Sequence, residues 1–279
     1  MMMIDPAAIP YIPAPSLDLG ITKLQSWGLL VAAGFLFGAW FAARWAKRTG
    51  LSAKPVYDFA MWAFLGGFVG AHLVHVLAYE PEIIKKNPLA LLYFWEGVSS
   101  FGGFLGAGIA AFIYFRISGL PFLPYSDALA LGMAPGWAIG RIGCFLAHDH
   151  IGRSTQCWLG IDFPAHVVSP PGIRHDLGLY DSLVSWTLFA VLLLVVSQKP
   201  RYGVLGAILC STYAIARFFL DYLRAVDIQN PDARYFGLTP AQYGCFLLLF
   251  AGIGLFTKSR GVAGERSFST WTHQQPPKH

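Results

Sequence analysis

The sequence predicts an all-α membrane protein with seven transmembrane helices, the N-terminus outside and the C-terminus in the cytoplasm. Hydrophobic residues make up 55% of its 279 residues and charged residues only 13%, whereas soluble domains carry about 25% charged residues. Apolar runs of about 20 residues, the length that crosses a bilayer core, recur along the chain. This composition excludes a secreted disulfide scaffold, a disordered chain and an ordinary soluble enzyme.

Each apolar run marks one expected span. The runs cover residues 26–46, 56–79, 98–115, 125–146, 179–196, 203–223 and 241–257. The proline-rich segment before the first run lacks the basic start of a signal peptide, so we expect no cleavage. The longest connection, about 147–178, lies on the outer side, and connections of this length are often functional. We expect residues 1–260 to form one transmembrane domain and residues 261–279 a disordered cytoplasmic tail.

The distribution of basic residues sets the predicted orientation. Eleven lysine and arginine residues fall on one side of the spans and seven on the other, and the richer side is expected to face the cytoplasm. Acidic residues on the outer side support this assignment: Glu80, Glu82, Glu96, Asp162, Asp176, Asp227 and Asp232. The net charge of +5 follows from this topology, so we expect no nucleic-acid partner.

Two arginines lie inside predicted spans, where an ionised side chain costs at least about 2.5 kcal/mol and usually marks function. Arg141 is near the outer end of the fourth span and has no evident partner on its own helix. Arg217 lies in the sixth span, four residues before Asp221, so these two share a helix face. Tyr213 and Arg224 extend the polar stripe by one turn each way. The stripe has a structural explanation, but two arginines from different helices also suit the phosphate of a phospholipid.

The outer loop opens with His148, Asp149 and His150. This pattern suggests either metal ligands or a general base, and a polar loop start without a special role is the plain alternative. His166 and His175 follow in the same loop, but their spacing matches no metal motif.

Glycines crowd at the outer end of the third span, where Gly102 and Gly103 lie side by side in the chain. Small residues let helices approach closely, and a second interpretation is that these glycines open the backbone to a lipid head group. His72 and His75 in the second span have a similar plain explanation, because hydrogen bonds to neighbouring segments would satisfy them.

A family resemblance is carried by the segment GRIGCFLAHDHIGR at 140–153. It resembles the signature of the prolipoprotein diacylglyceryl transferase family, approximately Gly-Arg-x-Gly-Asn-Phe-x-Asn-Gly-Glu-x-x-Gly-Arg. Four other segments resemble family motifs in the family's order, namely YFWEGVSSFGGFLG, RHDLGLYDS, ARFFLDYLRAVD and FGLTPAQYG. The resemblance covers nearly the whole chain, and seven spans with the N-terminus outside agree with the family.

The resemblance implies a multi-pass enzyme of the bacterial cytoplasmic (inner) membrane that uses no cofactor. Surrounded by membrane lipids, it would move a diacylglyceryl group from phosphatidylglycerol to the thiol of a lipobox cysteine in an exported prolipoprotein, and glycerol phosphate would leave. The thiol must lose its proton, and the phosphate needs cationic stabilisation. The candidate catalytic residues are Arg141, Arg217, Asp149, His148 and His150. The candidate phospholipid-binding residues are Arg141, Arg153, Gly102, Gly103, Tyr213, Asp221 and Arg224.

The chain departs from the family pattern at two positions that bear on the chemistry. Phe101 stands where the family motif carries a histidine often assigned as essential, and Cys144 replaces an asparagine. Either His148 or His150 supplies the missing base, or the chemistry has changed, or activity is lost. The thiol of Cys144 beside Arg141 is a further candidate nucleophile.

Two other functions stay open. One is a non-catalytic paralogue that binds phospholipid or lipoprotein precursors, and the other is a metal-dependent membrane hydrolase built on the histidine loop. A transporter is less favoured, because the charges gather toward the outer side and no chain-wide repeat is evident.

Overall fold

A computed structural model describes residues 8–18, 23–79, 82, 87–93, 97, 99–229, 231–232 and 234–261 of the chain. The described residues fall into two compact units. Residues 8–42 and 126–261 belong to the first unit, and residues 43–125 belong to the second. The predicted tail at 261–279 lies outside the described residues except for its first residue.

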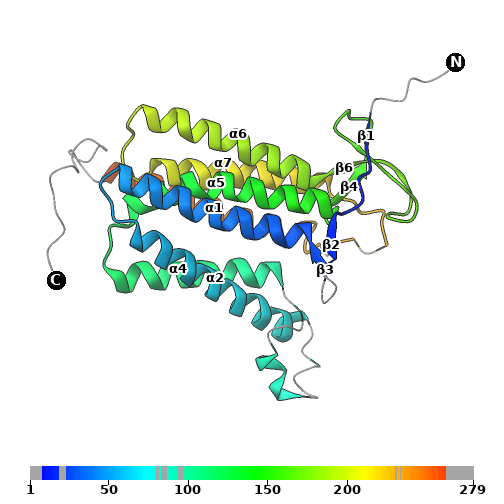
Figure 1. The fold of residues 1–279 in the computed structure, drawn as a ribbon, viewed down its shortest axis with the longest axis horizontal. Helices are drawn as coiled ribbons and strands as arrows, with labels where there is room; N and C mark the ends of the chain where they lie inside the picture. The colour runs from blue at the N-terminus through cyan, green and yellow to red at the C-terminus, as the bar shows by residue number, and fades with distance from the viewer. Residues whose placement is uncertain are drawn as a thin grey trace. The chain divides into compact units, whose positions relative to one another are not determined.

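Five long helices build the first unit (Figure 1). They are α1 (Ser26–Arg48), whose last turns enter the second unit, α5 (Phe122–Ala147), α6 (Leu177–Ser197), α7 (Val204–Leu220), which η3 (Asp221–Leu223) extends, and α8 (Pro240–Gly261). Their starts have physical causes. The carboxylate of Asp176 accepts a hydrogen bond from the Leu179 amide at the start of α6, at 3.0 Å. A proline opens α8, where its missing N–H costs nothing.

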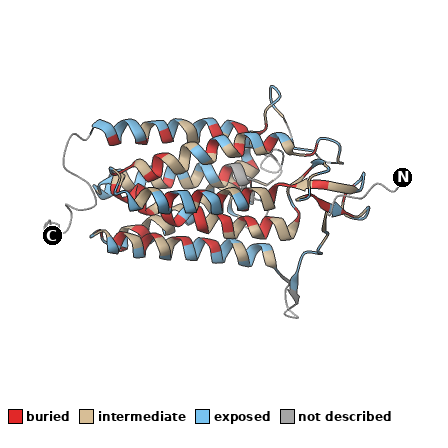
Figure 2. Cartoon of the chain, turned by 90° about the horizontal axis from the view of Figure 1, so that it is seen from above, coloured by how far each residue is buried: buried red, intermediate tan, exposed pale blue. Residues whose placement is uncertain are grey.

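These helices expose large apolar side chains instead of covering them. Exposed residues recur along the helices in Figure 2, and Leu194, Phe219 and Phe250 are each more than 60% exposed. Such a surface needs lipid around it. Within the described ranges, six helices are long and apolar enough to cross a membrane: Ser26–Arg48, Lys54–Leu77, Phe122–Ala147, Leu177–Ser197, Val204–Leu223 and Pro240–Gly261. The protein is therefore a multi-pass, mostly helical membrane protein.

The third predicted span, 98–115, coincides with helix α4 (Ser100–Ser118). The apolar part of this helix, Gly102–Ser118, is shorter than the six helices named above. The other six predicted spans each overlap a helix that is long enough, with ends that differ by a few residues. Six candidate spans are thus established, and the seventh stays a prediction.

The connection between α5 and α6 forms, together with an N-terminal strand, a small sheet that the sequence analysis did not predict. Four strands pair in the order β1 (Ile9–Pro10), β5 (Ile161–Phe163), β6 (Gly172–Asp176) and β4 (Ile151–Ser154). Strand β1 runs parallel to β5, and the other pairs are antiparallel. Ile161, Phe163 and Val168 form its buried core. A second pair, β2 (Ser16–Asp18) and β3 (Lys23–Gln25), is antiparallel and precedes α1.

The second unit is built on α2 (Lys54–Val74) and α4 (Ser100–Ser118). A π-helical turn, η1 (His75–Tyr79), continues α2, and a 3-10 turn, η2 (Pro88–Leu92), precedes α4. Glycines let the two helices touch, because a Cβ added to Gly102 would lie 2.3 Å from the Gly70 carbonyl oxygen. The buried His72 lies with Nδ1 3.3 Å from the Gly97 carbonyl oxygen, which agrees with the structural interpretation of this histidine.

In the first unit, α1 and α5 approach through a similar contact. A Cβ added to Gly34 would lie 2.3 Å from the Gly136 carbonyl oxygen, and one added to Gly38 would lie 2.9 Å from that of Gly132. The backbones therefore meet directly, and this contact holds α5, which carries Arg141, against α1.

We expect Gly34→Ala to lower the free energy of unfolding by about 1–3 kcal/mol, because the new methyl group must push α1 from α5. Gly28→Ala on the same helix is the matched control, since nothing lies within 4 Å of its added Cβ. The control should be neutral or stabilising by up to about 1 kcal/mol through helix propensity. Thermal unfolding in one detergent measures both variants, and equal stability of the two would contradict the close packing.

Candidate active site

Charged side chains from three helices meet at the end of the first unit that carries the sheet. The end of α5, the start of α6 and the end of α7 come together there (Figure 1). Asp181 of α6 links the other two helices by contacting an arginine on each. Its Oδ2 lies 2.8 Å from Arg141 Nε of α5 and 3.7 Å from Arg217 Nη1 of α7. The same oxygen accepts a hydrogen bond from the Tyr213 hydroxyl at 3.1 Å, and that hydroxyl accepts one from Trp137 Nε1 at 2.7 Å.

A second carboxylate extends the cluster along α7. Asp221 Oδ1 lies 3.1 Å from Arg217 Nη2 and 3.4 Å from Arg224 Nε. The hydroxyl of Thr239 donates to its other oxygen. Gln242 fixes that threonine, because its Oε1 accepts a hydrogen bond from the Thr239 amide at 3.0 Å. The motif at the start of α8 therefore holds Asp221, and Asp221 in turn orients two arginines.

Two arginine nitrogens of the cluster have unused hydrogen-bonding capacity. Arg141 Nη2 and Arg217 Nη1 are buried without a hydrogen-bond partner among the described residues. Arg141 and Arg217 pair with the buried carboxylates Asp181 and Asp221, and Arg224 pairs with Asp221 and with the exposed Asp232. Buried guanidinium donors of this kind are the features that bind an anion such as phosphate.

His148 does not face this cluster. It adopts a left-handed backbone conformation, with φ 51°, which turns its buried ring into the core beneath the sheet. Its Nδ1 lies 2.9 Å from Asp176 Oδ2 and its Nε2 lies 3.1 Å from the Ile12 carbonyl oxygen. Phe163 packs against the same ring. His148 thus ties the N-terminal segment to the start of α6.

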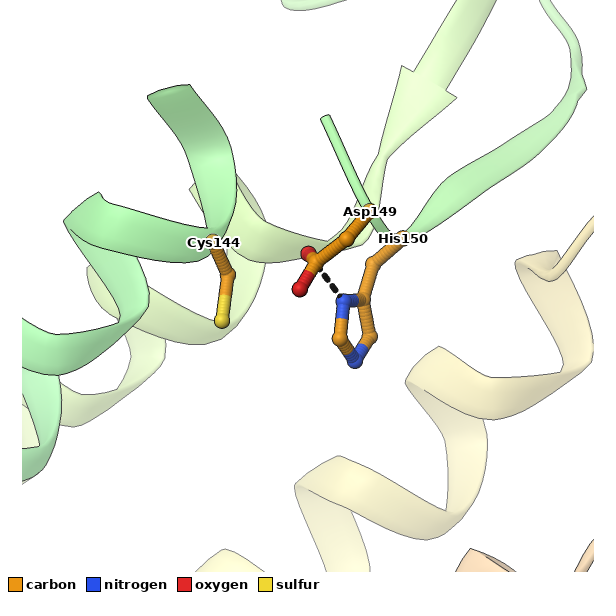
Figure 3. A group of neighbouring side chains, drawn as sticks. All are labelled: Cys144, Asp149 and His150. Carbon is orange, nitrogen blue, oxygen red and sulfur yellow. Dashed lines mark hydrogen bonds and ion pairs between the residues drawn. The ribbon is translucent and has the colours of Figure 1, made fainter. Parts of the chain in front are cut away.

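Asp149 and His150 turn the other way, toward the end of α5. Figure 3 shows their side chains and that of Cys144 pointing toward one another. His150 Nδ1 is hydrogen-bonded to the Asp149 carboxylate, and Nε2 lies 3.3 Å from Arg141 Nη1. The same Nη1 donates to the Cys144 sulfur at 3.3 Å. The two histidines of the loop therefore have different surroundings. His148 contacts Asp176 and Ile12, whereas His150 contacts Asp149 and Arg141.

The surroundings of this pair shift its titration. Burial lowers the pKa of His150, and the charges of Arg141 and Arg224 lower it further against the raising effect of Asp149. Burial acts to raise the pKa of Asp149, but the hydrogen bond with His150 and the charge of Arg141 outweigh burial and hold this pKa below its ordinary value. Near neutral pH, Asp149 is therefore ionised and His150 is neutral.

Among the described residues, Cys144, Asp149 and His150 are the group of cysteine, acid and histidine close enough to hold a metal ion, with ligand atoms within 4.8 Å of one another. Arg141 Nη1, however, is already 3.3 Å from both the sulfur and the imidazole Nε2. A cation placed between these ligands would meet this fixed positive charge. The donor set fits a hydrogen-bond network better than a metal centre.

A buried arginine holds the loop above the cluster. Arg174 of β6 binds both oxygens of Asp227, at 3.0 and 2.7 Å, and donates to the Gly152 carbonyl oxygen at 3.2 Å. The hydrogen bond from Arg174 lowers the pKa of Asp227. Arg153 is exposed, and its Nε donates to the Arg224 carbonyl oxygen at 3.4 Å. Strand β4 is thereby fastened to the segment that carries Arg224.

The structure brings together most of the predicted residues, namely Arg141, Tyr213, Arg217, Asp221, Arg224, Asp149 and His150. Gly102 and Gly103 lie in the second unit, and their contact with lipid stays a prediction. Phe101 falls on α4, but its side chain lies outside the described residues. Sequence reasoning missed the central role of Asp181, although an acidic residue at a span boundary was the available signal.

Comparisons with known proteins identify the family of the chain. The family profile described as prolipoprotein diacylglyceryl transferase matches residues 15–258. The chain belongs to the prolipoprotein diacylglyceryl transferase family. It is 31% identical to the phosphatidylglycerol–prolipoprotein diacylglyceryl transferase of Chromohalobacter salexigens, over 90% of this chain and 94% of that protein. The protein of that name from Nitratidesulfovibrio vulgaris strain Miyazaki F is 30% identical over 92% and 97%. The one from Pseudoalteromonas atlantica is 31% identical over 78% and 79%.

Asp181→Asn should destabilise this family member strongly, by about 3–5 kcal/mol, because it leaves Arg141 and Arg217 buried with less compensation. The matched control is Asp58→Asn, which removes an exposed ion pair with Lys54 and should cost at most about 0.5 kcal/mol. Thermal unfolding of the two variants in detergent measures the difference. If both variants melt with the wild type, Asp181 does not hold the cluster together.

Proposed function

We propose that this chain transfers the diacylglyceryl group of phosphatidylglycerol to the thiol of a lipobox cysteine in an exported prolipoprotein. Family membership and the names of the relatives support this reaction class. The observation that carries the proposal is the arginine cluster around Asp181, because it offers buried, unsatisfied donors to a phosphate inside an apolar bundle. Glycerol phosphate is the leaving group, and these donors stabilise the negative charge that develops on it.

The roles of the cluster follow from its contacts. Arg141 and Arg217 hold the phosphate. Tyr213 orients the two guanidinium groups through its hydrogen bond to Asp181, and Asp221 orients Arg217 by direct contact. Arg224 and Arg153 lie toward the loop, where the glycerol end of the head group would reach. Gly102 and Gly103 stay a predicted contact for the lipid head group.

The proposed arrangement in the membrane extends the same reasoning. The chain crosses the bacterial inner membrane seven times, α4 supplies the seventh span, and the N-terminus lies outside. The sheet of the outer loop then faces the exported acceptor, and residues 1–260 act as one transmembrane domain with a cytoplasmic tail. The excess of basic residues on the opposite connections supports this orientation.

A non-catalytic lipid-binding protein is the second candidate. One observation favours it, since Phe101 replaces the family histidine. This candidate uses the same arginine cluster to hold phosphatidylglycerol but predicts no turnover. The assay that separates the two incubates purified protein with phosphatidylglycerol in detergent and a lipobox peptide, and follows the peptide by mass spectrometry. A gain of one diacylglyceryl group supports the transferase, and lipid binding without this gain supports the alternative.

In this assay, Arg141→Ala and Arg217→Ala should each lower transfer about 100-fold or more, because each removes a donor to the departing phosphate. Arg260→Ala is the control, since this arginine is exposed in the last turn of α8, and it should keep the wild-type rate. All variants must insert into membranes and elute as folded protein. Full activity of both cluster variants would remove the arginines from the mechanism.

A further inference from the structure

The proposed transfer needs a group that takes the proton of the acceptor thiol, and two loop histidines compete for this role. A general base needs a ring nitrogen with a lone pair that faces the reacting atoms. His148 offers none, because Nδ1 faces the Asp176 carboxylate and Nε2 faces the Ile12 carbonyl oxygen. Both of these partners accept hydrogen bonds, and the ring is buried away from the arginine cluster.

His150 meets the requirement through the identity of its two neighbours. Arginine carries donors and no acceptor, so the contact at 3.3 Å between Arg141 Nη1 and Nε2 uses the lone pair of Nε2. The proton then sits on Nδ1 and is donated to the Asp149 carboxylate. A carboxylate that holds the far nitrogen of an imidazole fixes its tautomer and stabilises the imidazolium that forms after proton transfer.

The geometry points to His150 as the general base of the transfer and to Asp149 as the residue that positions it. This assignment rests on the proposed function and deepens it. The base lies at the phosphate site itself, because the Arg141 guanidinium contacts both His150 and the centre of the cluster. Proton removal from the thiol and departure of the phosphate then occur beside the same arginine.

The step balances as a single displacement. Nε2 takes the proton from the thiol, and the sulfur lone pair forms a bond to the glycerol carbon that carries the phosphate. The bond between this carbon and the phosphate ester oxygen breaks, and its electron pair leaves on glycerol phosphate. The proton on His150 passes to the departing phosphate or to water, which restores the neutral imidazole.

Lipid binding prepares the base for the thiol. In the structure the lone pair of Nε2 is engaged by Arg141 Nη1. A phosphate group offers this nitrogen a stronger, charge-assisted hydrogen bond. When Nη1 turns to the phosphate, Nε2 is released for the acceptor thiol. The base therefore becomes available when the lipid is in place.

Rates of transfer measured between about pH 5 and pH 9 test the assignment with purified protein, phosphatidylglycerol in detergent and a lipobox peptide. The groups that face His150 are Asp149, Arg141, Arg224 and Cys144. Burial and the charges of Arg141 and Arg224 outweigh Asp149 and hold the pKa of His150 below its ordinary value. Wild-type activity should therefore fall only below this value, as the base becomes protonated.

His150→Gln should lower the rate at pH 7 about 100-fold or more, with phosphatidylglycerol binding kept within a few-fold. The remaining rate should follow the ionisation of the peptide thiol, so that it lacks the wild-type plateau near neutral pH and rises up to the thiol pKa of about 8.5. His166→Gln in the same loop is the matched control, because that side chain is exposed, and it should keep the wild-type rate and profile.

Asp149→Asn supplies a readout that a purely structural role would not move. Asp149 raises the pKa of His150, so its neutral replacement should shift the fall in activity to lower pH. An unmoved profile in Asp149→Asn, or a wild-type rate in His150→Gln, would overturn the assignment while leaving the transferase intact. Absence of transfer by the wild-type protein, beside an active family enzyme, would instead overturn the proposed function.

Discussion

The first unit depends on how an apolar helix bundle buries several charges at one of its ends. Asp181 is fully buried, and one of its oxygens faces two arginines and a tyrosine hydroxyl from neighbouring helices. Ionised groups persist in such surroundings only when they are paired and hydrogen bonded. Arg141 Nη2 and Arg217 Nη1 still have no hydrogen-bond partner among the described residues, and these spare donors distinguish a site for an anionic ligand from an inert structural cluster.

The sheet in the connection between α5 and α6 has a positional role that follows from Arg174. This fully buried arginine draws β6, the Gly152 carbonyl and Asp227 together. The segment after η3 is thereby pinned beside β4, which places Arg224 near the loop that carries His150. Because the loop is fastened at both strands, Asp149 and His150 hold a fixed direction toward α5. A long connection of this kind would otherwise sample many conformations.

Local patterns in the sequence predicted what local physics decides. Apolar runs located the helices, and four-residue spacing placed Arg217 beside Asp221. The contact of Arg141 with Asp181 was not predicted, because it joins residues 40 positions apart on different helices. The sheet was missed for the same reason, since its strands are short and β1 pairs with a strand about 150 residues later. The different tasks of His148 and His150 depend on Ile12, Asp176 and Arg141, and spacing alone does not reveal such partners.

The chemistry of the product decides what Cys144 can do. Its sulfur lies 3.3 Å from Arg141, a position that also suits a nucleophile accepting the diacylglyceryl group before the substrate thiol does. Such an intermediate would carry a carbon–sulfur thioether bond, the same kind of bond as in the final product. A second thiol would then have to expel a thiolate from an alkyl carbon without the phosphate that drives the first displacement. Transfer through Cys144 would therefore stop at the modified enzyme, so the lipid must react directly with the acceptor thiol, and Cys144 serves as a hydrogen-bond partner that holds Arg141.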